Sequence, residues 1–356
     1  MNYLNYPKLS SQKSMVIGST SMYVEKSDFS CMLTSPLVSV VVITFNHGEF
    51  IQEAVESIAK QQCTFPFEII IGDDFSNDDT RHLALTLQAR FSSLIRVIMY
   101  KKNVGMNINF ATLIGLARGK FLAFCEGDDY WQVSNKLQRH ADLLQACPDV
   151  SLVFSDYGRT FFSEKKWHWV ERTVPDYVNA NTQLSLFSLL KEMHIHLSAM
   201  MAPSALIREY LVSVYHNQQR SLGDVPLFLY LASQGNVRYL DGSVSTYRQH
   251  SASATNRSKA GFLKIVMDHA AVVDFFSSRF VNANQYREIR LAMRRRIANA
   301  AYVAGSKRDY LNNMDLASPK AWLRLSLMLV PILHERKLTR ERERQRKSLM
   351  ALGQTQ

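Results

Sequence analysis

The chain has few cysteines and none of the spacings that indicate a cysteine metal site. Its four cysteines, Cys31, Cys63, Cys125 and Cys147, are scattered among 356 residues. No pair of them shows the short separation of a zinc-binding motif, and Cys125 ends an apolar run that is typical of a core strand. A reduced, cytoplasmic compartment is the simplest interpretation.

The sequence also lacks a secretion signal and a membrane-spanning run. Residues 1–35 are polar, and they contain no basic stretch followed by an apolar one. The apolar segment 323–333 is interrupted by Arg324, Ser326 and Pro331, and it is too short to cross a bilayer. Any contact with a membrane is therefore expected to be peripheral.

Composition favours a folded protein with an anionic partner. Hydrophobic residues make up 47% of the chain, enough for a full α/β core and a second, smaller subdomain. The formal charge of +11 suits a nucleic acid, an acidic membrane surface or a phosphorylated substrate. Charge alone does not choose among these partners.

Strands and helices alternate through the first half of the chain. Apolar runs predict strands, and apolar residues at helical spacing predict helices between them. The expected strands are 37–43, 67–72, 95–100 and 120–125, and the expected helices are 49–61, 80–91 and 109–118. This order predicts a mostly parallel, doubly wound sheet that binds ligands at the carboxyl ends of its strands.

The alternation fades beyond residue 150. A further short strand is expected at 150–155, and helical spacing returns at 181–193, at 224–233 and from residue 260 onward. The final charge run, 335–347, is typical of a solvated helix or a frayed tail.

An acidic cluster follows the strand at 120–125. Glu126, Asp128 and Asp129 concentrate negative charge there, and a hard divalent cation such as Mg²⁺ or Mn²⁺ would neutralise it. The alternative is that the two aspartates only cap the helix that begins near Asn135. Tyr130 and Trp131, which a solvated turn rarely carries, favour the functional interpretation.

A second acidic pair, Asp73 and Asp74, ends the strand at 67–72, where one carboxylate could accept a hydrogen bond from a base or a ribose. Thr44 and Asn46 could contact the nucleotide from the first loop. The segment that follows the pair is expected to form a turn and a helix cap through Ser76, Asp78, Asp79 and Thr80. Gly105 suits a backbone turn.

Together these segments resemble the donor-binding half of the family 2 inverting glycosyltransferases of the GT-A fold. The resemblance covers residues 36–157 and rests on four motifs in order, which are Val40 to Asn46, Ile69 to Thr80, Asn103 to Gly105 and Glu126 to Trp131. It implies an α/β, GT-A nucleotide-diphospho-sugar transferase fold with a C-terminal helical extension.

The resemblance also implies roles for individual residues. Thr44, Asn46, Asp73 and Asp74 would bind the base and ribose, and Asn103 and Asp129 would complete the donor site. Asp128 would be the principal metal ligand. Glu126 stands where the family usually has the first Asp of its metal motif, which makes its part in metal binding less certain than that of Asp128.

An inverting transfer needs a general base on the face of the sugar opposite the diphosphate. Asp224 opens a predicted helix, and its plain interpretation is an N-cap; the family places its catalytic Asp at such a position. The resemblance further suggests Arg248 as a diphosphate contact and His250 as a metal or phosphate contact. His194 and His196 are expected to be core or loop residues.

The chain is thus divided by prediction into an extension at 1–35, a nucleotide-sugar-binding half at 36–157, an acceptor-binding and catalytic-base half at 158–256 and a basic helical region at 257–356. The last region either binds anionic lipid or packs on the catalytic part. The expected partners are a nucleoside diphosphate sugar and a glycan or lipid-linked acceptor. The expected setting is bacterial cell-surface polysaccharide synthesis, such as lipopolysaccharide or capsule, on the cytoplasmic face of the membrane.

Three other functions stay open at this point. A nucleotidyltransferase would need a phosphate loop rich in Gly and Lys or Arg, and the segment 44–49 has no Lys or Arg. A nucleic-acid-binding protein would interleave basic residues with exposed aromatics on one element, whereas here the basic residues gather in the tail. An inactive, sugar-binding relative of the family would keep the donor motifs without the transfer reaction.

Overall fold

A computed structural model describes residues 22–32, 35–163, 166–170, 182–192, 195–213, 224–250, 259–314, 318–328 and 337–338. Most of the predicted N-terminal extension and most of the charge run at 335–347 lie outside the described residues. His194 also lies outside them.

Four parallel strands form the centre of the sheet, and helices connect them as predicted. The strands are β2 (Val38–Thr44), β3 (Phe67–Asp73), β4 (Ile95–Tyr100) and β5 (Phe121–Glu126). The connecting helices are α1 (Ile51–Ala59), α2 (Thr80–Arg90) and α3 (Met106–Leu116). Every residue of β2 is buried, as expected of a strand covered on both faces.

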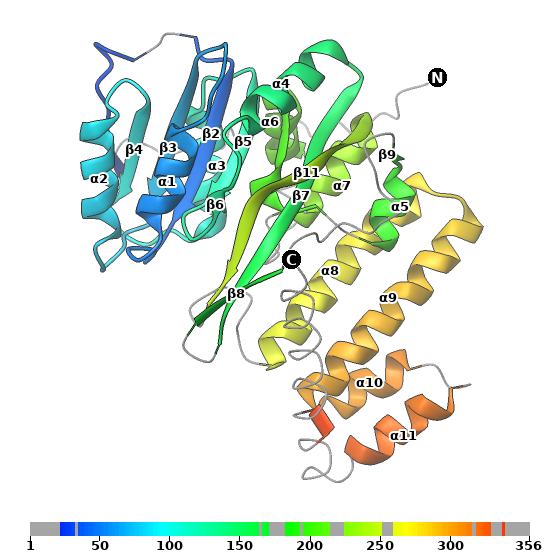
Figure 1. The fold of residues 1–356 in the computed structure, drawn as a ribbon. Helices are drawn as coiled ribbons and strands as arrows, with labels where there is room; N and C mark the ends of the chain where they lie inside the picture. Colours follow the sequence, from blue (N-terminus) through cyan, green and yellow to red (C-terminus); the bar gives the residue numbers. More distant parts are fainter. Residues whose placement is uncertain are drawn as a thin grey trace.

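The complete sheet runs in the order β1-β4-β3-β2-β5-β10-β7-β11-β6, with β8 paired to β7 and β9 to β11. The added strands are β1 (Tyr23–Lys26), β6 (Tyr130–Trp131), β7 (Val150–Ser163), β8 (Lys166–Val170), β9 (Gln183–Leu184), β10 (Met200–Pro203) and β11 (Asn236–Gln249). Figure 1 shows β7 and β11 as a long ribbon that leads from the sheet toward the C-terminal helices. This second half of the sheet contains antiparallel pairs, such as β10 with β5 and with β7.

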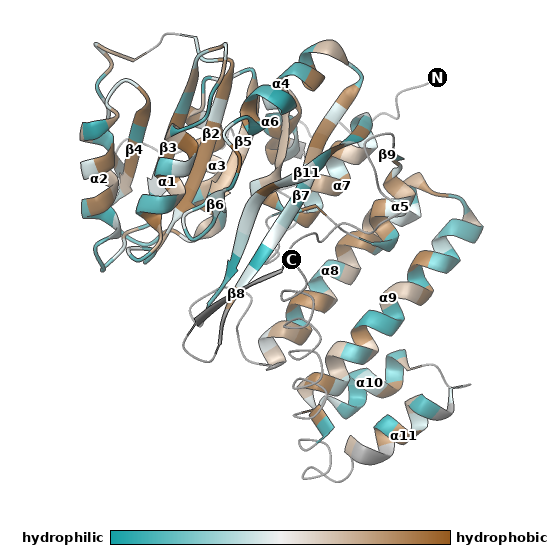
Figure 2. Cartoon of the chain, viewed as in Figure 1, coloured by the Kyte–Doolittle hydropathy of each residue, from teal (hydrophilic) through white to brown (hydrophobic). Residues whose placement is uncertain are grey.

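Helices cover both faces of the sheet. One apolar core lies under α1, α2 and α4 (Lys136–Ala146), and the other lies under α3, α5 (Leu186–Lys191), α6 (Ser204–Ser213) and α7 (Val225–Gln234). The long helices α8 (Lys259–Phe280) and α9 (Ala283–Ala304) join this second core through Val272, Phe276 and Ile289. Figure 2 shows the central strands as mostly hydrophobic and the outer helices as carrying hydrophilic residues.

The end of the described chain forms a small core of its own. Helices α10 (Lys307–Asn313) and α11 (Pro319–Met328) pack against the end of α9 around Tyr302, Tyr310 and Met314. Among the described residues, no helix combines the length and apolar character that a bilayer crossing requires.

Two local features differ from expectation, and a third excludes an alternative. Residues 23–26 form β1, an edge strand paired with β4 inside the segment expected to be an extension. Strand β7 continues to Ser163, well past the predicted end at residue 155, because it pairs with β11 over most of its length. The N-cap of α4 is Asn135, so Asp128 and Asp129 do not cap this helix.

Candidate functional site

The predicted site residues come together at the carboxyl edge of the parallel strands. Thr44 is paired in register with Asp73, and Ile43 with Glu126, so three separate loops begin at one level of the sheet. Ligands bind at this edge in open α/β sheets because the connecting loops diverge there.

The loop that follows β2 is hydrogen-bonded to the loop that follows β3. Asn46 has a positive φ of 55°, and its Oδ1 accepts a hydrogen bond from the backbone N–H of Asn77 at 3.0 Å. In return, the N–H of Asn46 donates to Ser76 Oγ at 2.9 Å. The Oγ1 of Thr44 is buried and has no hydrogen-bond partner among the described residues. Thr44 therefore offers a free polar atom, whereas Asn46 shapes the loop.

Asp73 and Asp74 are both buried, and the chain itself contacts their carboxylates. Asp73 accepts from Arg81 Nε at 2.6 Å. Asp74 accepts from the N–H groups of Val104 and Gly105 at 2.7 and 2.9 Å. Burial raises the pKa of Asp74 despite these two hydrogen bonds.

Asn103 belongs to the same arrangement, because its Nδ2 donates to the backbone oxygen of Asp74 at 3.0 Å. Gly105 adopts a φ of 87°, which confirms the predicted backbone turn. The two aspartates thus connect the end of β3 to α2 and to the loop after β4.

The loop after β5 carries the acidic cluster. Burial and the charges of Asp129, Asp128 and Asp224 raise the pKa of Glu126 well above its ordinary value. Burial also raises the pKa of Asp129 strongly, with Asp128 adding to the effect. A divalent cation would relieve this concentration of negative charge, so the donor set suits one.

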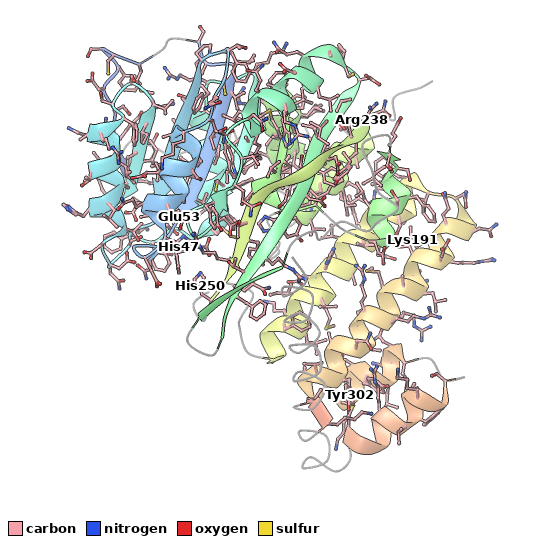
Figure 3. All side chains as sticks on the ribbon, in the orientation of Figure 1. His47, Glu53, Lys191, Arg238, His250 and Tyr302 are labelled. Carbon is pink, nitrogen blue, oxygen red and sulfur yellow. The ribbon has the colours of Figure 1, made fainter. Side chains whose placement is uncertain are left out.

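Asp128 faces two histidines. His250 Nε2 lies 3.1 Å from Asp128 Oδ2, and His47 Nε2 lies 3.8 Å from the same oxygen. Burial raises the pKa of Asp128, but the hydrogen bond from His250 and the charge of His47 outweigh burial, and the pKa is lowered overall. Figure 3 shows His47 and His250 at the same edge of the sheet.

Asp129 points away from this pair into the interior. Its Oδ2 accepts from Ser198 Oγ at 2.6 Å, and its Oδ1 accepts from the N–H of Arg248 at 3.1 Å. His196 Nδ1 lies 3.8 Å from Asp129 Oδ2, and the His196 ring lies between the rings of Tyr157 and Tyr247 at 4.8 Å from each.

Among the described residues, one group of three possible ligands lies close enough together to hold a cation. Atoms of Glu126, Asp129 and His196 all lie within 4.8 Å of one another. Burial lowers the pKa of His196 to about 4, which leaves it a neutral imidazole. Both oxygens of Asp129 are already hydrogen-bonded, however, so the more available carboxylate is that of Asp128.

Arg248 connects the acidic loop to α1. One guanidinium nitrogen donates to the backbone oxygen of Asp128 at 2.9 Å, and another bonds Glu53 of α1. The guanidinium carbon lies 4.4 Å from the ring centre of Tyr130 and 5.2 Å from that of Phe50. Arg248 is therefore enclosed between two rings and two oxygen acceptors.

Asp224 is the N-cap of α7, as its plain interpretation predicts. Its Oδ1 accepts from the N–H of Val225 at 2.8 Å. Burial raises the pKa of Asp224, and its charge in turn raises the pKa of Glu126.

His47 and His196 were not predicted as site residues. His47 directly follows the first motif, between Asn46 and α1, and its closeness to the loop after β5 follows from the parallel pairing of β2 and β5. His196 was assigned to a core or loop. No spacing in the sequence connects it to Asp129.

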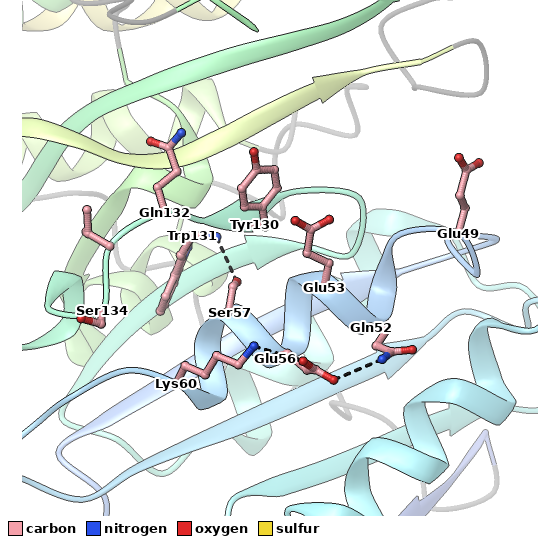
Figure 4. Close-up of a pocket in the computed structure, with 11 residues that line it drawn as sticks. Glu49, Gln52, Glu53, Glu56, Ser57, Lys60, Tyr130, Trp131, Gln132 and Ser134 are labelled. Atoms are coloured by element: carbon pink, nitrogen blue, oxygen red, sulfur yellow. Dashed lines mark hydrogen bonds and ion pairs between the residues drawn. The ribbon is translucent and has the colours of Figure 1, made fainter. Parts of the chain in front are cut away.

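A groove of about 700 Å³ opens beside the acidic loop, between α1 and β6. Its lining residues are Glu49, Gln52, Glu53, Glu56, Ser57, Lys60, Tyr130, Trp131, Gln132, Val133 and Ser134. Figure 4 shows Glu53 and Tyr130 facing the groove and Lys60 bonded to Glu56 at its floor.

A mostly parallel sheet with acidic loops at the carboxyl ends of its strands is the arrangement of the α/β, GT-A fold. Residues 39–211 match the family described as "Glycosyl transferase family 2". We assign this segment, 173 of the 356 residues, to the family.

Relatives and solved structures agree with this assignment. An uncharacterized protein of Mycobacterium tuberculosis, Rv1520, is 30% identical over 60% of this chain, which spans 59% of that protein's length. The putative teichuronic acid biosynthesis glycosyltransferase TuaG of Bacillus subtilis is 25% identical over 63% of this chain and 84% of its own.

Two solved structures share the fold. The mannosyltransferase PcManGT from Pyrobaculum calidifontis, in complex with GDP-Man and Mn²⁺, is 15% identical, with a TM-score of 0.52 over 85% of this chain and 87% of its own. The crystal structure of S. aureus TarS is 16% identical, with a TM-score of 0.50 over 78% of this chain and 53% of that one.

Proposed function

We propose that the chain transfers a sugar, with inversion, from a nucleoside diphosphate sugar to a hydroxyl of a glycan or a lipid-linked acceptor. The observation that carries the proposal is the convergence of three loops at one sheet edge, where Thr44 is level with Asp73 on one side and Ile43 is level with Glu126 on the other. A family 2 relative with a teichuronic acid name and a fold neighbour solved with GDP-Man and Mn²⁺ support it.

In this proposal the donor half holds the nucleotide. Thr44, Asn46, Asp73, Asp74 and Asn103 form the surface for the base and ribose. Thr44 Oγ1, which is buried and unpartnered, is the atom best placed to hydrogen-bond a nucleoside.

Asp128 and His250 would hold a divalent cation, with Glu126 as a further carboxylate. Such a cation, Mg²⁺ or Mn²⁺, would neutralise charge on the diphosphate when bound. Asp129 and Arg248 keep the loop in place from the interior side. A diphosphate contact by Arg248 would add to this role.

Asp224 would accept the proton of the acceptor hydroxyl as the sugar carbon exchanges its bond to the diphosphate for a bond to that hydroxyl. The raised pKa of Asp224, caused by burial, suits a base of this kind, because a stronger base takes a proton more readily. The proton passes to the Asp224 carboxylate and the electron pair leaves with the nucleoside diphosphate.

A panel of uridine, guanosine and thymidine diphosphate sugars tests the proposal. We expect one of them to raise the thermal midpoint of the protein and to be slowly hydrolysed in the presence of Mn²⁺. Failure of every donor to stabilise the protein, with or without metal, would contradict the proposal. Donor binding without hydrolysis or transfer would indicate an inactive relative instead.

The C-terminal helices suit peripheral contact with an anionic membrane at the cytoplasmic face, where a lipid-linked acceptor of cell-surface polysaccharide synthesis would lie. Trp322 and Leu323 of α11 are 50% and 57% exposed, and Lys320, Arg294 and Arg295 are exposed on α11 and α9. Sedimentation with phosphatidylglycerol vesicles should fall for a Trp322→Ala variant and with added salt, and neutral vesicles should bind little protein.

A further inference from the structure

His47 lies at the acidic loop without a structural task for its ring. Its Nε2 points to Asp128 Oδ2 at 3.8 Å, beyond hydrogen-bond distance. Its Nδ1 is buried and has no hydrogen-bond partner among the described residues. The side chain as a whole is 20% exposed, but a buried ring nitrogen without a partner is costly unless a ligand or a water completes it.

The backbone holds His47 firmly in this position. Its N–H donates to Thr80 Oγ1 at 2.7 Å, and its carbonyl oxygen accepts from the N–H groups of Phe50 and Ile51, both at 2.9 Å, where α1 begins. The ring is thus attached to the start of a helix and to the loop after β3. A residue fixed in this way presents its ring to the acidic loop before any ligand binds.

Gly127 allows the acidic loop to approach the ring. A Cβ atom at residue 127 would lie 2.8 Å from His47 Nδ1 and 2.6 Å from Thr44 Oγ1, closer than real contacts of a Cβ. The glycine therefore permits the two unpartnered polar atoms to lie directly against the residue that precedes Asp128.

His250 approaches the same carboxylate from another element, immediately after β11. Its Nε2 lies 3.1 Å from Asp128 Oδ2, and the rings of His47 and His250 are perpendicular with centres 6.5 Å apart. Two imidazoles from separate elements, 203 positions apart in the chain, thus face one carboxylate oxygen. Imidazole ligands suit transition metals, whereas Mg²⁺ prefers oxygen ligands and keeps its waters.

We infer that His47 is an additional ligand of the cation at Asp128, and that the resulting pair of imidazoles makes the site prefer Mn²⁺ to Mg²⁺. This inference rests on the proposed function, which supplies the cation. It adds His47 as a ligand and a preference for Mn²⁺ over Mg²⁺. His47 reaches the cation through Nε2, the nitrogen that already faces Asp128.

Metal binding to the full chain tests the inference without any donor sugar. Pulsed EPR on bound Mn²⁺ should detect two coordinated imidazole nitrogens in the natural protein and one in His47→Gln or in His250→Gln. The affinity for Mn²⁺ should fall roughly tenfold or more in His47→Gln, the scale of losing a supporting group at a metal site, and the preference over Mg²⁺ should shrink. The matched control is His82→Gln on α2, where the histidine is exposed and far from the acidic loop.

Two results would overturn the inference. One is a single coordinated nitrogen in the natural protein, which needs no variant and so does not depend on whether His47→Gln folds. The other is unchanged Mn²⁺ affinity in a His47→Gln protein whose circular dichroism and thermal midpoint match the natural protein. Either result leaves the proposed transfer reaction standing if a donor sugar still binds, whereas loss of donor binding with intact metal binding would count against the proposed function alone.

Discussion

Asp224 combines a structural and a proposed chemical role in one side chain, and a single substitution separates them. Asn at this position keeps a carbonyl oxygen that can accept from the N–H of Val225, so α7 keeps its cap. We expect Asp224→Asn to melt within a degree or two of the natural protein while sugar transfer falls by about two to four orders of magnitude.

A second variant should remove both the helix cap and the proposed base at Asp224. Asp224→Ala should lose transfer to the same extent and also about 1 kcal/mol of stability, because the cap is gone. Transfer assays and thermal melts on both variants check this. Normal transfer by Asp224→Asn would show that another group takes the proton.

Lys136, a buried residue outside the proposed site, is expected to make the stability of the protein depend on pH. Its Nζ lies 3.9 Å from the ring centre of Trp131 and 3.4 Å from the oxygen of Met200, and burial lowers its pKa to about 7. In the unfolded chain the lysine has its ordinary pKa of about 10.4, so it keeps its proton up to about that pH. Between these values the unfolded state binds more protons than the folded state, so stability rises with pH.

We therefore expect the urea midpoint of the natural protein to increase from pH 7 to pH 9.5. Lys136→Met should lack that increase and should be more stable than the natural protein at pH 6, where the buried charge is present. Lys102→Met, at an exposed lysine, is the matched control and should keep the slope. Equal slopes in both variants would contradict the assignment to Lys136.

The sequence contains most of the donor site at this scale, since Asp73, Asp74 and Asp128 lie at strand ends that periodicity locates. It does not reveal how each carboxylate is used. Asp73 pairs with Arg81, and Asp129 bonds Ser198. Spacing could not predict the second contact, because it joins residues 69 positions apart that only packing brings together. The same reason hides His196 from sequence analysis.

At the scale of elements, the edge strand β1 is attached to the sheet by a buried ionic network. Arg96 of β4 bonds Glu25 of β1 at 2.8 Å and Glu68 of β3 at 3.4 Å, and its side chain is 5% exposed. Arg118 adds a second cation to Glu68 at 2.7 Å. The sequence did not predict this strand, because its four paired residues are too few to show a period-two pattern.

Removing Arg96 should leave Glu68 buried with a missing partner. We expect Arg96→Ala to lower the free energy of unfolding by about 3 to 5 kcal/mol. Arg90→Ala, which breaks the exposed pair of Arg90 with Glu56, should cost about 1 kcal/mol or less. Urea denaturation of the two variants distinguishes the buried pair from the exposed one, and equal losses would refute the distinction.

At the scale of the whole molecule, the C-terminal helices divide into two groups. Helices α8 and α9 join the core beneath the sheet through Val272 and Phe276 of α8 and Ile289 of α9, whereas α10 and α11 pack around Tyr310. Helical periodicity predicted this helical region, but sequence alone could not say which helices enter the main core. That depends on which helix faces meet α5 and α7.

Two truncations test this division. A chain that ends at residue 258 should lose its cooperative thermal transition and aggregate, because the surface of α7 becomes exposed. A chain that ends at residue 304 should keep a cooperative transition at a lower temperature. A cooperative melt for the shorter chain would show that the catalytic part folds without α8 and α9.

The enclosure of Arg248 has a consequence for the energetics of donor binding. Its guanidinium is held between Phe50 and Tyr130 and attaches the acidic loop to α1. That loop therefore loses its conformational freedom once, when the chain folds. It would not lose it again each time a donor binds. A donor that arrives meets a rigid template, so its affinity depends on how well its diphosphate matches a shape that was set in advance.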